Sequence, residues 1–244
     1  MENIMEIFVS IFLVLALLWL HFRIFFKKEY QACRSRVFFL DVSAIVIILM
    51  GFFSPQTYVF LMEEDYIGEW VTFYAFILSG LIITRHLWNY RKNGLTIFSL
   101  SFIFSLATAV FCLVVAGEEV SWGQRIFAFK PPDLFLEQNY QQEFNVHNLF
   151  KGDGLWGIQI ESKHLVMLVA FFYGILFPLL TRLPTPLKSL NKLTPAFYLM
   201  PYFIMVIAME QIYPISLTGE ACEMFLGLIF LVHIFDRNYI RKKG

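Results

Sequence analysis

The sequence predicts an all-α protein, a single polytopic bundle of about seven transmembrane helices with a short interfacial helix in one long connection. Two observations predict this fold. Of the 244 residues, 58% are hydrophobic and the mean hydropathy is +0.64, far above the values of soluble domains. Apolar runs of about 20 residues, the length that a bilayer core requires, recur along the whole chain. We therefore expect residues 1–244 to form one integral membrane domain.

The apolar runs define the candidate spans in order. They cover residues 4–25, 37–60, 68–88, 95–116, 164–181, 196–215 and 219–236. The first run has no basic flank before it and no small-residue cleavage site after it, so we expect a retained span rather than a cleaved signal peptide. Prolines leave the ends of the fifth and sixth spans open, namely Pro178, Pro195, Pro201 and Pro214. Six spans plus a re-entrant segment are the alternative.

Charge determines the expected orientation. Basic residues follow alternate spans, namely Arg23, Lys27, Lys28, Arg34, Arg36, Arg85, Arg91, Lys92, Arg182, Lys188, Lys192, Arg237, Arg241, Lys242 and Lys243. The short connections between them carry acids without any Lys or Arg, namely Glu63, Glu64, Asp65, Glu69, Glu210, Glu220 and Glu223. Because Lys and Arg accumulate on the cytoplasmic side, the N-terminus is expected outside and the C-terminus in the cytoplasm.

The connection 117–163 is expected to form a cap on the outer face. It is about 45 residues long, whereas structureless loops rarely exceed about 15. Its aromatic residues suit the headgroup region, namely Trp122, Phe127, Phe129, Phe135, Tyr140, Phe144, Phe150 and Trp156. After Pro131 and Pro132, the stretch "PDLFLEQNYQQEFNVHNLF" is predicted to form a short interfacial helix. On that helix, Asn139, Glu143 and His147 would share one face.

The fourth span predicts different roles for two adjacent carboxylates. A stripe of small residues permits close helix packing, namely Ser101, Ser105, Thr108, Cys112 and Ala116. Glu119 lies five helical turns after Ser101 and continues this stripe, so we expect it to face the bundle interior and to meet His147 or Glu210. Glu118 lies about 100° away and is expected to pair with Arg125.

Several His and Glu side chains are candidate metal ligands. A single divalent ion held by some of Glu119, His147, His164 and Glu210 is chemically reasonable, although no HxxxH or HExxH spacing accompanies these residues. Glu161 and His164 form one E-x-x-H pair, whereas a di-iron centre needs two. The carboxylates Glu220 and Glu223 also suit a helix N-terminus, where they serve as caps.

A motif in the cap resembles a known pattern. "EEVSWGQRIFAF", "PPDLF" and "NYQQEFNVHNL" are similar to E-E-x-S-W-G-Q-R, T-P and N-x-Q-x-E-x-N-x-H-N in a family of uncharacterised bacterial polytopic membrane proteins. The similarity covers about 35 residues, and Pro131 stands where the pattern has Thr. It implies no activity, but it joins Glu118, Glu119, Trp122, Gln124, Arg125, Asn139, Gln142, Glu143, Asn145, His147 and Asn148 into one unit. With the orientation, it favours a multi-pass protein of the bacterial inner membrane.

The leading functional hypothesis is an enzyme acting on a lipid or lipid-linked headgroup at the outer leaflet, with Glu119, His147 and Glu210 as catalytic groups. The expected binding residues are Glu118, Trp122, Gln124, Arg125, Asn139, Gln142, Glu143, Asn145, Asn148 and His164. One alternative is a transporter or channel component. The other is a noncatalytic subunit that presents the cap to a membrane or extracytoplasmic protein partner. A formal net charge of zero and the absence of a nucleotide-binding loop exclude nucleic acid as the expected partner.

Overall fold

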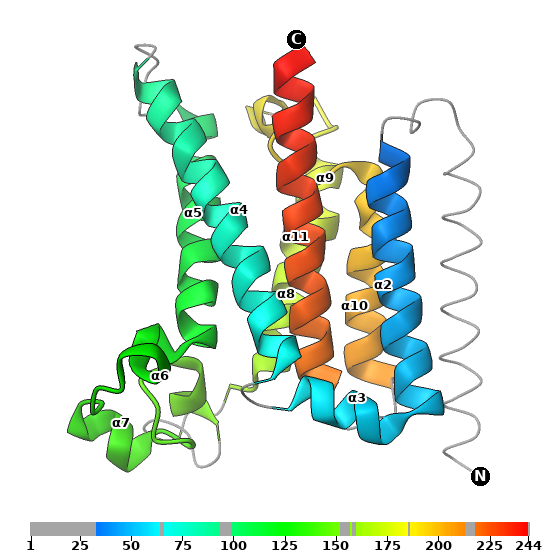
Figure 1. Ribbon diagram of the computed structural model, residues 1–244. Coiled ribbons are helices and arrows are strands. Elements are labelled where there is room, and N and C mark those ends of the chain that lie inside the picture. The colour runs from blue at the N-terminus through cyan, green and yellow to red at the C-terminus, as the bar shows by residue number, and fades with distance from the viewer. Residues whose placement is uncertain are drawn as a thin grey trace.

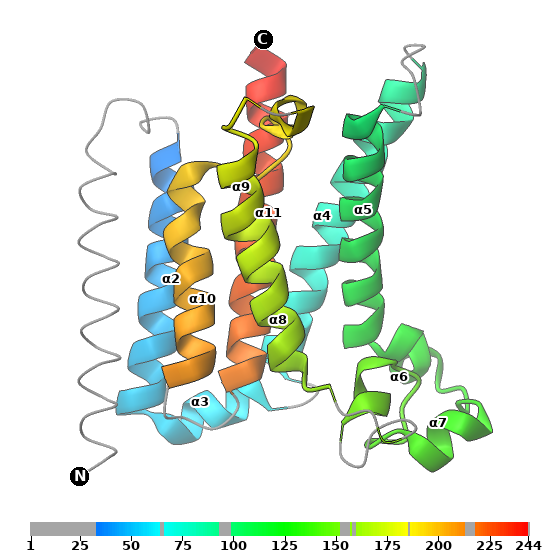
Figure 2. The same cartoon turned by 180° about the vertical axis from the view of Figure 1, so that it is seen from behind.

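The computed structural model describes residues 33–63, 66–92, 99–151, 157, 160–184, 186–212 and 218–243. Within these ranges every regular element is a helix and no strand occurs, so the all-α prediction is confirmed for them. The long helices stand side by side with α11 in the middle, and the C-terminal end of α11 and the short helices α3, α6 and α7 lie at opposite ends (Figure 1). Figure 2 shows that α8, α9 and α10 cover the rear of α11.

Five helices in the described ranges are long and apolar enough to cross a membrane. They are Arg34–Phe53, Ile67–Asn89, Leu100–Glu119, Ser162–Leu180 and Thr218–Asp236. A shorter apolar helix covers Phe197–Gln211. These segments correspond to the second to seventh predicted spans, whereas the predicted span 4–25 lies outside the described residues. The described chain therefore has the helix lengths and composition of an integral membrane protein.

The predicted span 37–60 is two helices. Helix α2 (Arg34–Phe53) ends before Ser54, whose backbone has φ −144° and ψ 62°, and α3 (Pro55–Met62) begins at Pro55. Proline disfavours the helical conformation of the residue before it but suits the first position of a new helix. As a result α3 runs across the end of the bundle, where Tyr58 is fully buried (Figure 1).

Helices α4 (Ile67–Lys92) and α5 (Leu100–Glu119) form a closely packed pair. A Cβ added at Gly80 would lie 2.8 Å from the Leu113 side chain, so the two backbones approach closely there. The predicted small-residue stripe of α5 is buried at its last four members, Ser105, Thr108, Cys112 and Ala116. The predicted face of α5 is therefore buried as far as Ala116, and the last turn of the helix is half-buried.

The rear of the bundle contains a widened helical turn. Helix α8 (Ser162–Phe171) continues through the π-helical turn η4 (Phe172–Leu176) into α9 (Phe177–Leu180). Pro178 lacks the N–H that would donate to the carbonyl of Gly174 in a regular helix, and the π turn lies directly before it. Gly174 itself touches Phe203, because an added Cβ would lie 2.0 Å from Cγ of that ring.

Phe203 belongs to α10 (Met200–Ile212), which follows the single turn η6 (Phe197–Leu199). Helix α11 (Thr218–Lys243) completes the bundle and is the most buried of the five candidate spans, at 61% of its apolar window. Its Phe230 is 1% exposed and stacks on Tyr173 at a centroid distance of 4.7 Å. The core is thus an aromatic cluster centred on α11.

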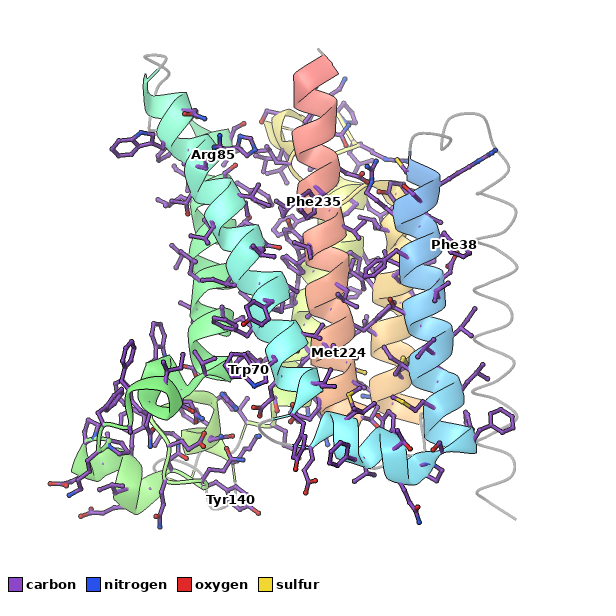
Figure 3. All side chains as sticks on the ribbon, in the orientation of Figure 1. Phe38, Trp70, Arg85, Tyr140, Met224 and Phe235 are labelled. Carbon is purple, nitrogen blue, oxygen red and sulfur yellow. The ribbon has the colours of Figure 1, made fainter. Side chains whose placement is uncertain are left out.

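Polar contacts tie the helices together at the end far from α3. Arg36 on α2 forms an ion pair with Asp236 on α11, and the Tyr202 hydroxyl on α10 donates to Asp41 Oδ1 at 2.7 Å. Helix α4 ends at the same end, where Arg85 is labelled in Figure 3. The connection after α9 contains the turn η5 (Pro186–Leu190) and also lies there (Figure 1). The basic connections of the described chain therefore gather at one end.

Candidate functional site

The opposite end of the bundle carries a compact unit, which we call the cap and define as residues 120–151. It contains η2 (Ser121–Gly123), α6 (Gln124–Phe127), α7 (Asp133–Gln138) and η3 (His147–Phe150). Figure 1 shows α6 and α7 beyond the end of α5. A short helix does follow Pro132, but α7 ends at Gln138 and covers six residues, so the predicted extension of the helix through residues 139–150 is wrong.

The side chain of Asn139 explains why the helix ends. Its Oδ1 accepts hydrogen bonds from the backbone N–H groups of Gln141 at 2.9 Å and Glu143 at 3.3 Å. Its Nδ2 donates to the backbone oxygen of Asn145 at 2.8 Å and to the Asn145 side chain. Asparagine favours such local turns over helix, and here the amide is 5% exposed. The expected helix face through Asn139, Glu143 and His147 therefore does not form.

A buried triangle joins the two ends of the cap. The Ser121 hydroxyl donates to Glu143 Oε2 at 2.7 Å, and Asn145 Nδ2 donates to the same oxygen at 3.0 Å and to Ser121 Oγ at 3.2 Å. Ser121 is fully buried and Asn145 is 2% exposed. Close by, Gln124 Oε1 accepts from the Phe144 N–H at 2.6 Å. These four polar side chains hold the returning chain against the segment that leaves α5.

A left-handed turn makes this return abrupt. Ser121, Trp122 and Gly123 have φ values of 46°, 52° and 86° in succession. For the two residues with a side chain, this conformation costs roughly 1–2 kcal/mol each. The Trp122 ring packs on Gly117, where an added Cβ would lie 3.0 Å from the ring, and its Nε1 donates to Glu118 Oε1 at 2.6 Å. These contacts and the buried triangle offset the backbone strain.

Glu118 is the central acceptor of the cap. Its Oε2 accepts hydrogen bonds from the N–H groups of Val146 at 2.6 Å and His147 at 2.9 Å. The same oxygen lies 3.2 Å from Nδ1 of the His147 ring. The expected partner of Glu118 was Arg125, whose side chain lies outside the described residues. The left-handed turn brings residues 146 and 147 back over Glu118, so this carboxylate bonds the histidine.

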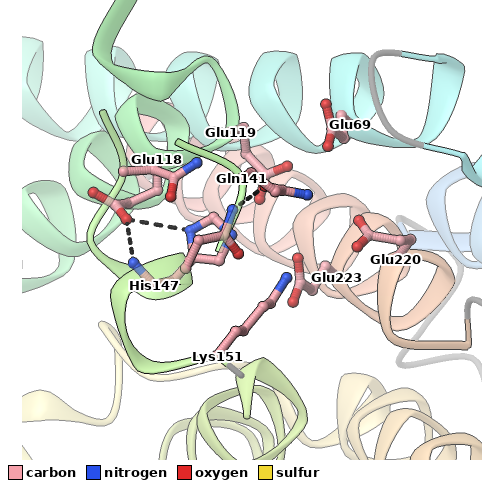
Figure 4. A pocket seen from close by; sticks show the side chains of 10 residues that line it. Glu69, Glu118, Glu119, Gln141, His147, Lys151, Glu220 and Glu223 are labelled. Carbon is pink, nitrogen blue, oxygen red and sulfur yellow. Dashed lines mark hydrogen bonds and ion pairs between the residues drawn. The ribbon is translucent and has the colours of Figure 1, made fainter. Parts of the chain in front are cut away.

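A pocket opens between the cap and the helix ends (Figure 4). Its volume is about 320 Å³, part of which is open to solvent. It is lined by Glu69, Glu118, Glu119, Gln141, Asn145, His147, Asn148, Lys151, Glu220 and Glu223. Among these described residues, five carboxylates face one lysine and one histidine. Figure 4 shows the Lys151 ammonium pointing towards Glu223.

The expected catalytic residues are only partly brought together. Glu119 and His147 line the same pocket, whereas Glu210 does not. Glu210 lies on α10, where its Oε1 is buried without a hydrogen-bond partner among the described residues. His164 is exposed in the first turn of α8, away from the pocket lining. Beside it, an ion pair with Lys163 lowers the pKa of the exposed Glu161.

One expected binding residue is replaced by its neighbour. Gln142 is exposed with φ 56°, whereas Gln141 lines the pocket and accepts a hydrogen bond from Asn148 Nδ2. In the pattern N-x-Q-x-E, the glutamine falls on Gln141 once Asn139 is aligned, so the motif itself carried this signal. Lys151 and Glu69 also line the pocket and were not expected there. Glu69 is distant from the motif in sequence, whereas Lys151 follows Asn148 by three residues but is not part of the pattern.

The described residues do not form a metal site. No group of three or more His, Cys, Asp and Glu side chains in the described ranges is placed to hold a metal ion. The hypothetical ligands Glu119, His147, His164 and Glu210 are instead distributed over the pocket, the start of α8 and the interior of α10. Helix geometry separates them, because α8 and α10 meet the end of the bundle behind α11 (Figure 2).

A second, mainly apolar hollow adjoins the pocket. It is lined by Glu69, Trp70, Glu119, Val120 and Ile126, so the two spaces share Glu69 and Glu119. Trp70 is 41% exposed and Ile126 56% exposed, on the outer surface of α4 and α6. The shared carboxylates stand between a polar compartment and an apolar one.

No protein family, no curated protein and no solved structure matches this chain. Function is therefore inferred from the geometry of the pocket.

Proposed function

We propose that this protein is a membrane enzyme that acts on the headgroup of a lipid or lipid-linked molecule at the outer face of the membrane. The observation that carries the proposal is the pair formed by Glu118 and His147 at the edge of an acidic pocket. A carboxylate at Nδ1 favours the tautomer that carries the proton there, and it leaves Nε2 as a base.

The roles of the other groups follow from where they lie. His147 transfers a proton to or from a water or a headgroup hydroxyl, and Glu118 is a positioning residue. Glu119 lines the pocket beside His147 and contacts the bound headgroup. The amides of Gln141 and Asn148 supply hydrogen bonds around it, while Asn145 holds the cap in place beneath them. This division supports a hydrolytic or transfer reaction at the headgroup that uses general acid–base catalysis.

The place of the pocket in the bundle supports a lipid substrate. It lies at the end of three candidate spans, α4, α5 and α11, where headgroups meet the helix termini. Exposed aromatic side chains of the cap suit the same region, because Trp122, Phe127 and Tyr140 are 46%, 76% and 70% exposed. The basic connections lie at the opposite end, which supports an outward cap, a cytoplasmic C-terminus and a place in the bacterial inner membrane.

The polar groups inside the bundle give a transport pathway less support than the pocket gives an enzyme. The Thr72 hydroxyl donates to Gly68 O at 2.9 Å, Ser79 to Ala75 O at 2.7 Å and Thr108 to Phe104 O at 2.8 Å. Each of these buried hydroxyls is therefore satisfied by its own helix rather than directed into a shared polar path. The exposed aromatics of the cap also suit a noncatalytic subunit, for which a protein partner would cover them.

Lipid turnover in proteoliposomes tests the proposal, with bacterial lipid extract as substrate and mass spectrometry of the lipids as readout. The His147→Gln variant should lose about 10²- to 10⁴-fold of the rate, which is the usual contribution of a general base. His164→Gln is the matched control, because that histidine is exposed and outside the pocket, and it should keep the wild-type rate.

Three results would contradict the enzyme proposal. They are unchanged lipids with the wild type, equal rates in both variants, and an ion flux that depends on the acidic pocket without any lipid turnover. A stoichiometric protein partner that co-purifies and protects Tyr140 from modification, again without turnover, would favour the noncatalytic subunit. Size-exclusion profiles of each variant ensure that only folded protein is compared.

A further inference from the structure

Asn148, which lines the pocket, has a side-chain oxygen without a hydrogen-bond partner among the described residues. Asn148 is 1% exposed, and its Nδ2 donates to Gln141. Its Oδ1 is buried and has no hydrogen-bond partner among the described residues. Because a buried acceptor without a partner is costly, this oxygen is suited to receive an N–H or O–H from a ligand in the pocket.

The charges around this acceptor favour a cation. Glu119 and Glu223 come from two different helices, α5 and α11, and line the same pocket as Asn148. Glu69 and Glu220 add two further carboxylates, while Lys151 contributes one positive charge. Carboxylates held close together repel one another, so a positively charged ligand group would relieve this repulsion.

The lining also distinguishes among cations. No Phe, Tyr or Trp ring is among the described residues that line the pocket, whereas quaternary ammonium groups are recognised by cages of such rings. No metal-binding group of three side chains is present in the described ranges. A primary ammonium has three N–H donors, which match Asn148 Oδ1 and the carboxylates of Glu119 and Glu223. The ligand chemistry that fits is therefore a primary amine.

The adjoining hollow adds an apolar requirement. It shares Glu69 and Glu119 with the pocket, and Trp70, Val120 and Ile126 complete its lining. A molecule whose amine lies near Glu119 can thus place apolar atoms against these three side chains. A free polar amine would leave the hollow unused, whereas an amphiphile would occupy both spaces.

We propose that the substrate is an amphiphile with a primary ammonium headgroup, bound between Glu119, Glu223 and Asn148, with its adjoining apolar part against Val120 and Ile126. This inference rests on the proposed function, because it names the substrate class of the same site. The class includes aminophospholipids and excludes lipids whose headgroups end in choline or glycerol.

The test measures lipid binding without turnover. The full chain in phosphatidylcholine nanodiscs is titrated with phosphatidylethanolamine or phosphatidylglycerol of the same acyl chains, and native mass spectrometry counts the bound lipid. Phosphatidylethanolamine should bind about tenfold or more tightly than the other two lipids. The Asn148→Leu variant should lose about tenfold or more of this affinity, as expected for one hydrogen bond to a charged group. Equal binding of the three lipids would overturn the proposal.

Two further variants separate the parts of the site. Ile126→Trp fills the apolar hollow. It should weaken the binding of phosphatidylethanolamine and leave the binding of water-soluble O-phosphoethanolamine unchanged. An equal loss for both ligands would exclude the apolar subsite. Asn148→Asp keeps an acceptor and should retain the preference for phosphatidylethanolamine, which keeps the test decisive if Asn148→Leu does not fold. Loss of the preference in folded Asn148→Asp would count against the ammonium contact.

The enzyme proposal and the ligand class can be refuted independently of each other. His147→Gln should lose about 10²- to 10⁴-fold of the turnover rate but should still prefer phosphatidylethanolamine, since the amine is bound by other residues. A wild type that selects this lipid without converting it would refute the enzyme and preserve the ligand class. Turnover that depends on His147 but acts on phosphatidylglycerol would preserve the enzyme and refute the amine.

Discussion

Replacement of Glu118 by glutamine should loosen the cap without unfolding the helix bundle. The carboxylate accepts hydrogen bonds from Trp122 Nε1 on one oxygen and from the N–H groups of Val146 and His147 on the other. Glutamine has one acceptor oxygen, so whichever way the amide is turned, an N–H donor faces its NH₂ group. At least one charge-assisted hydrogen bond is lost.

The size of the effect follows from that one bond. Hydrogen bonds to charged groups contribute about 1.5–3 kcal/mol, and the Glu118 side chain is only 13% exposed, so solvent replaces little of this loss. The free energy that holds the cap closed should fall by about that amount. Local opening of residues 145–150 should then become roughly 10- to 150-fold more frequent, because each 1.4 kcal/mol corresponds to a factor of ten.

Hydrogen–deuterium exchange with peptide resolution measures this opening directly. Peptides that contain Val146 and His147 should exchange faster in Glu118→Gln by the stated factor, while peptides from α10 and α11 should not change. Glu137→Gln is the matched control, because Glu137 is exposed on α7. Unchanged exchange at residues 145–150, or an equal acceleration throughout the bundle, would refute the role assigned to Glu118.

Three other predictions follow from the same structure. Glu119→Gln should abolish lipid turnover with little loss of folded protein, since Glu119 lines the pocket; equal loss of folded protein in Glu119→Gln and Glu118→Gln would mean that both are structural. Gly174→Ala should destabilise the bundle by about 1–3 kcal/mol in thermal unfolding, because its Cβ would lie 2.0 Å from Phe203; an unchanged midpoint would contradict the close packing. A reporter fused after Gly244 should read cytoplasmic, and Tyr140→Cys should react with impermeant reagents from outside; the reverse result would invert the orientation.

The helix bundle was predictable because its signal is local. Each span is an apolar run, and a bilayer sets the length of that run, so the hydropathy of the sequence suffices to find it. The helix break at Ser54 and Pro55 was missed because hydropathy contains no information on backbone conformation. Pro55 itself indicated the break, since a proline disfavours the helical conformation of the residue before it. The stripe ending at Ala116 was also local, and its last four members are buried, whereas Glu119 beyond it is half-buried and lines the pocket.

The cap was less predictable because its conformation depends on contacts between distant residues. Ser121 and Trp122 adopt left-handed conformations that their residue types disfavour, and buried hydrogen bonds from residues 143–145 maintain them. A four-residue spacing assumes a helix, whereas Asn139 replaces that helix with a turn. The choice of Gln142 over Gln141 had a different cause, because the pattern N-x-Q-x-E aligned on Asn139 places its glutamine at Gln141.

The adjacent carboxylates in "GEEVSWGQR" are separated in role by the turn that follows them. The left-handed residues Ser121 and Trp122 reverse the chain tightly. Residues 146 and 147 of the returning segment therefore contact the face of α5 that carries Glu118. Glu118 accepts hydrogen bonds from four N–H groups of the cap, one of them on the His147 ring. Glu119 lies one residue further round the helix and borders both the pocket and the apolar hollow. The strained turn therefore gives two neighbouring acids different surroundings, because Glu118 bonds the cap whereas Glu119 borders the pocket and the apolar hollow.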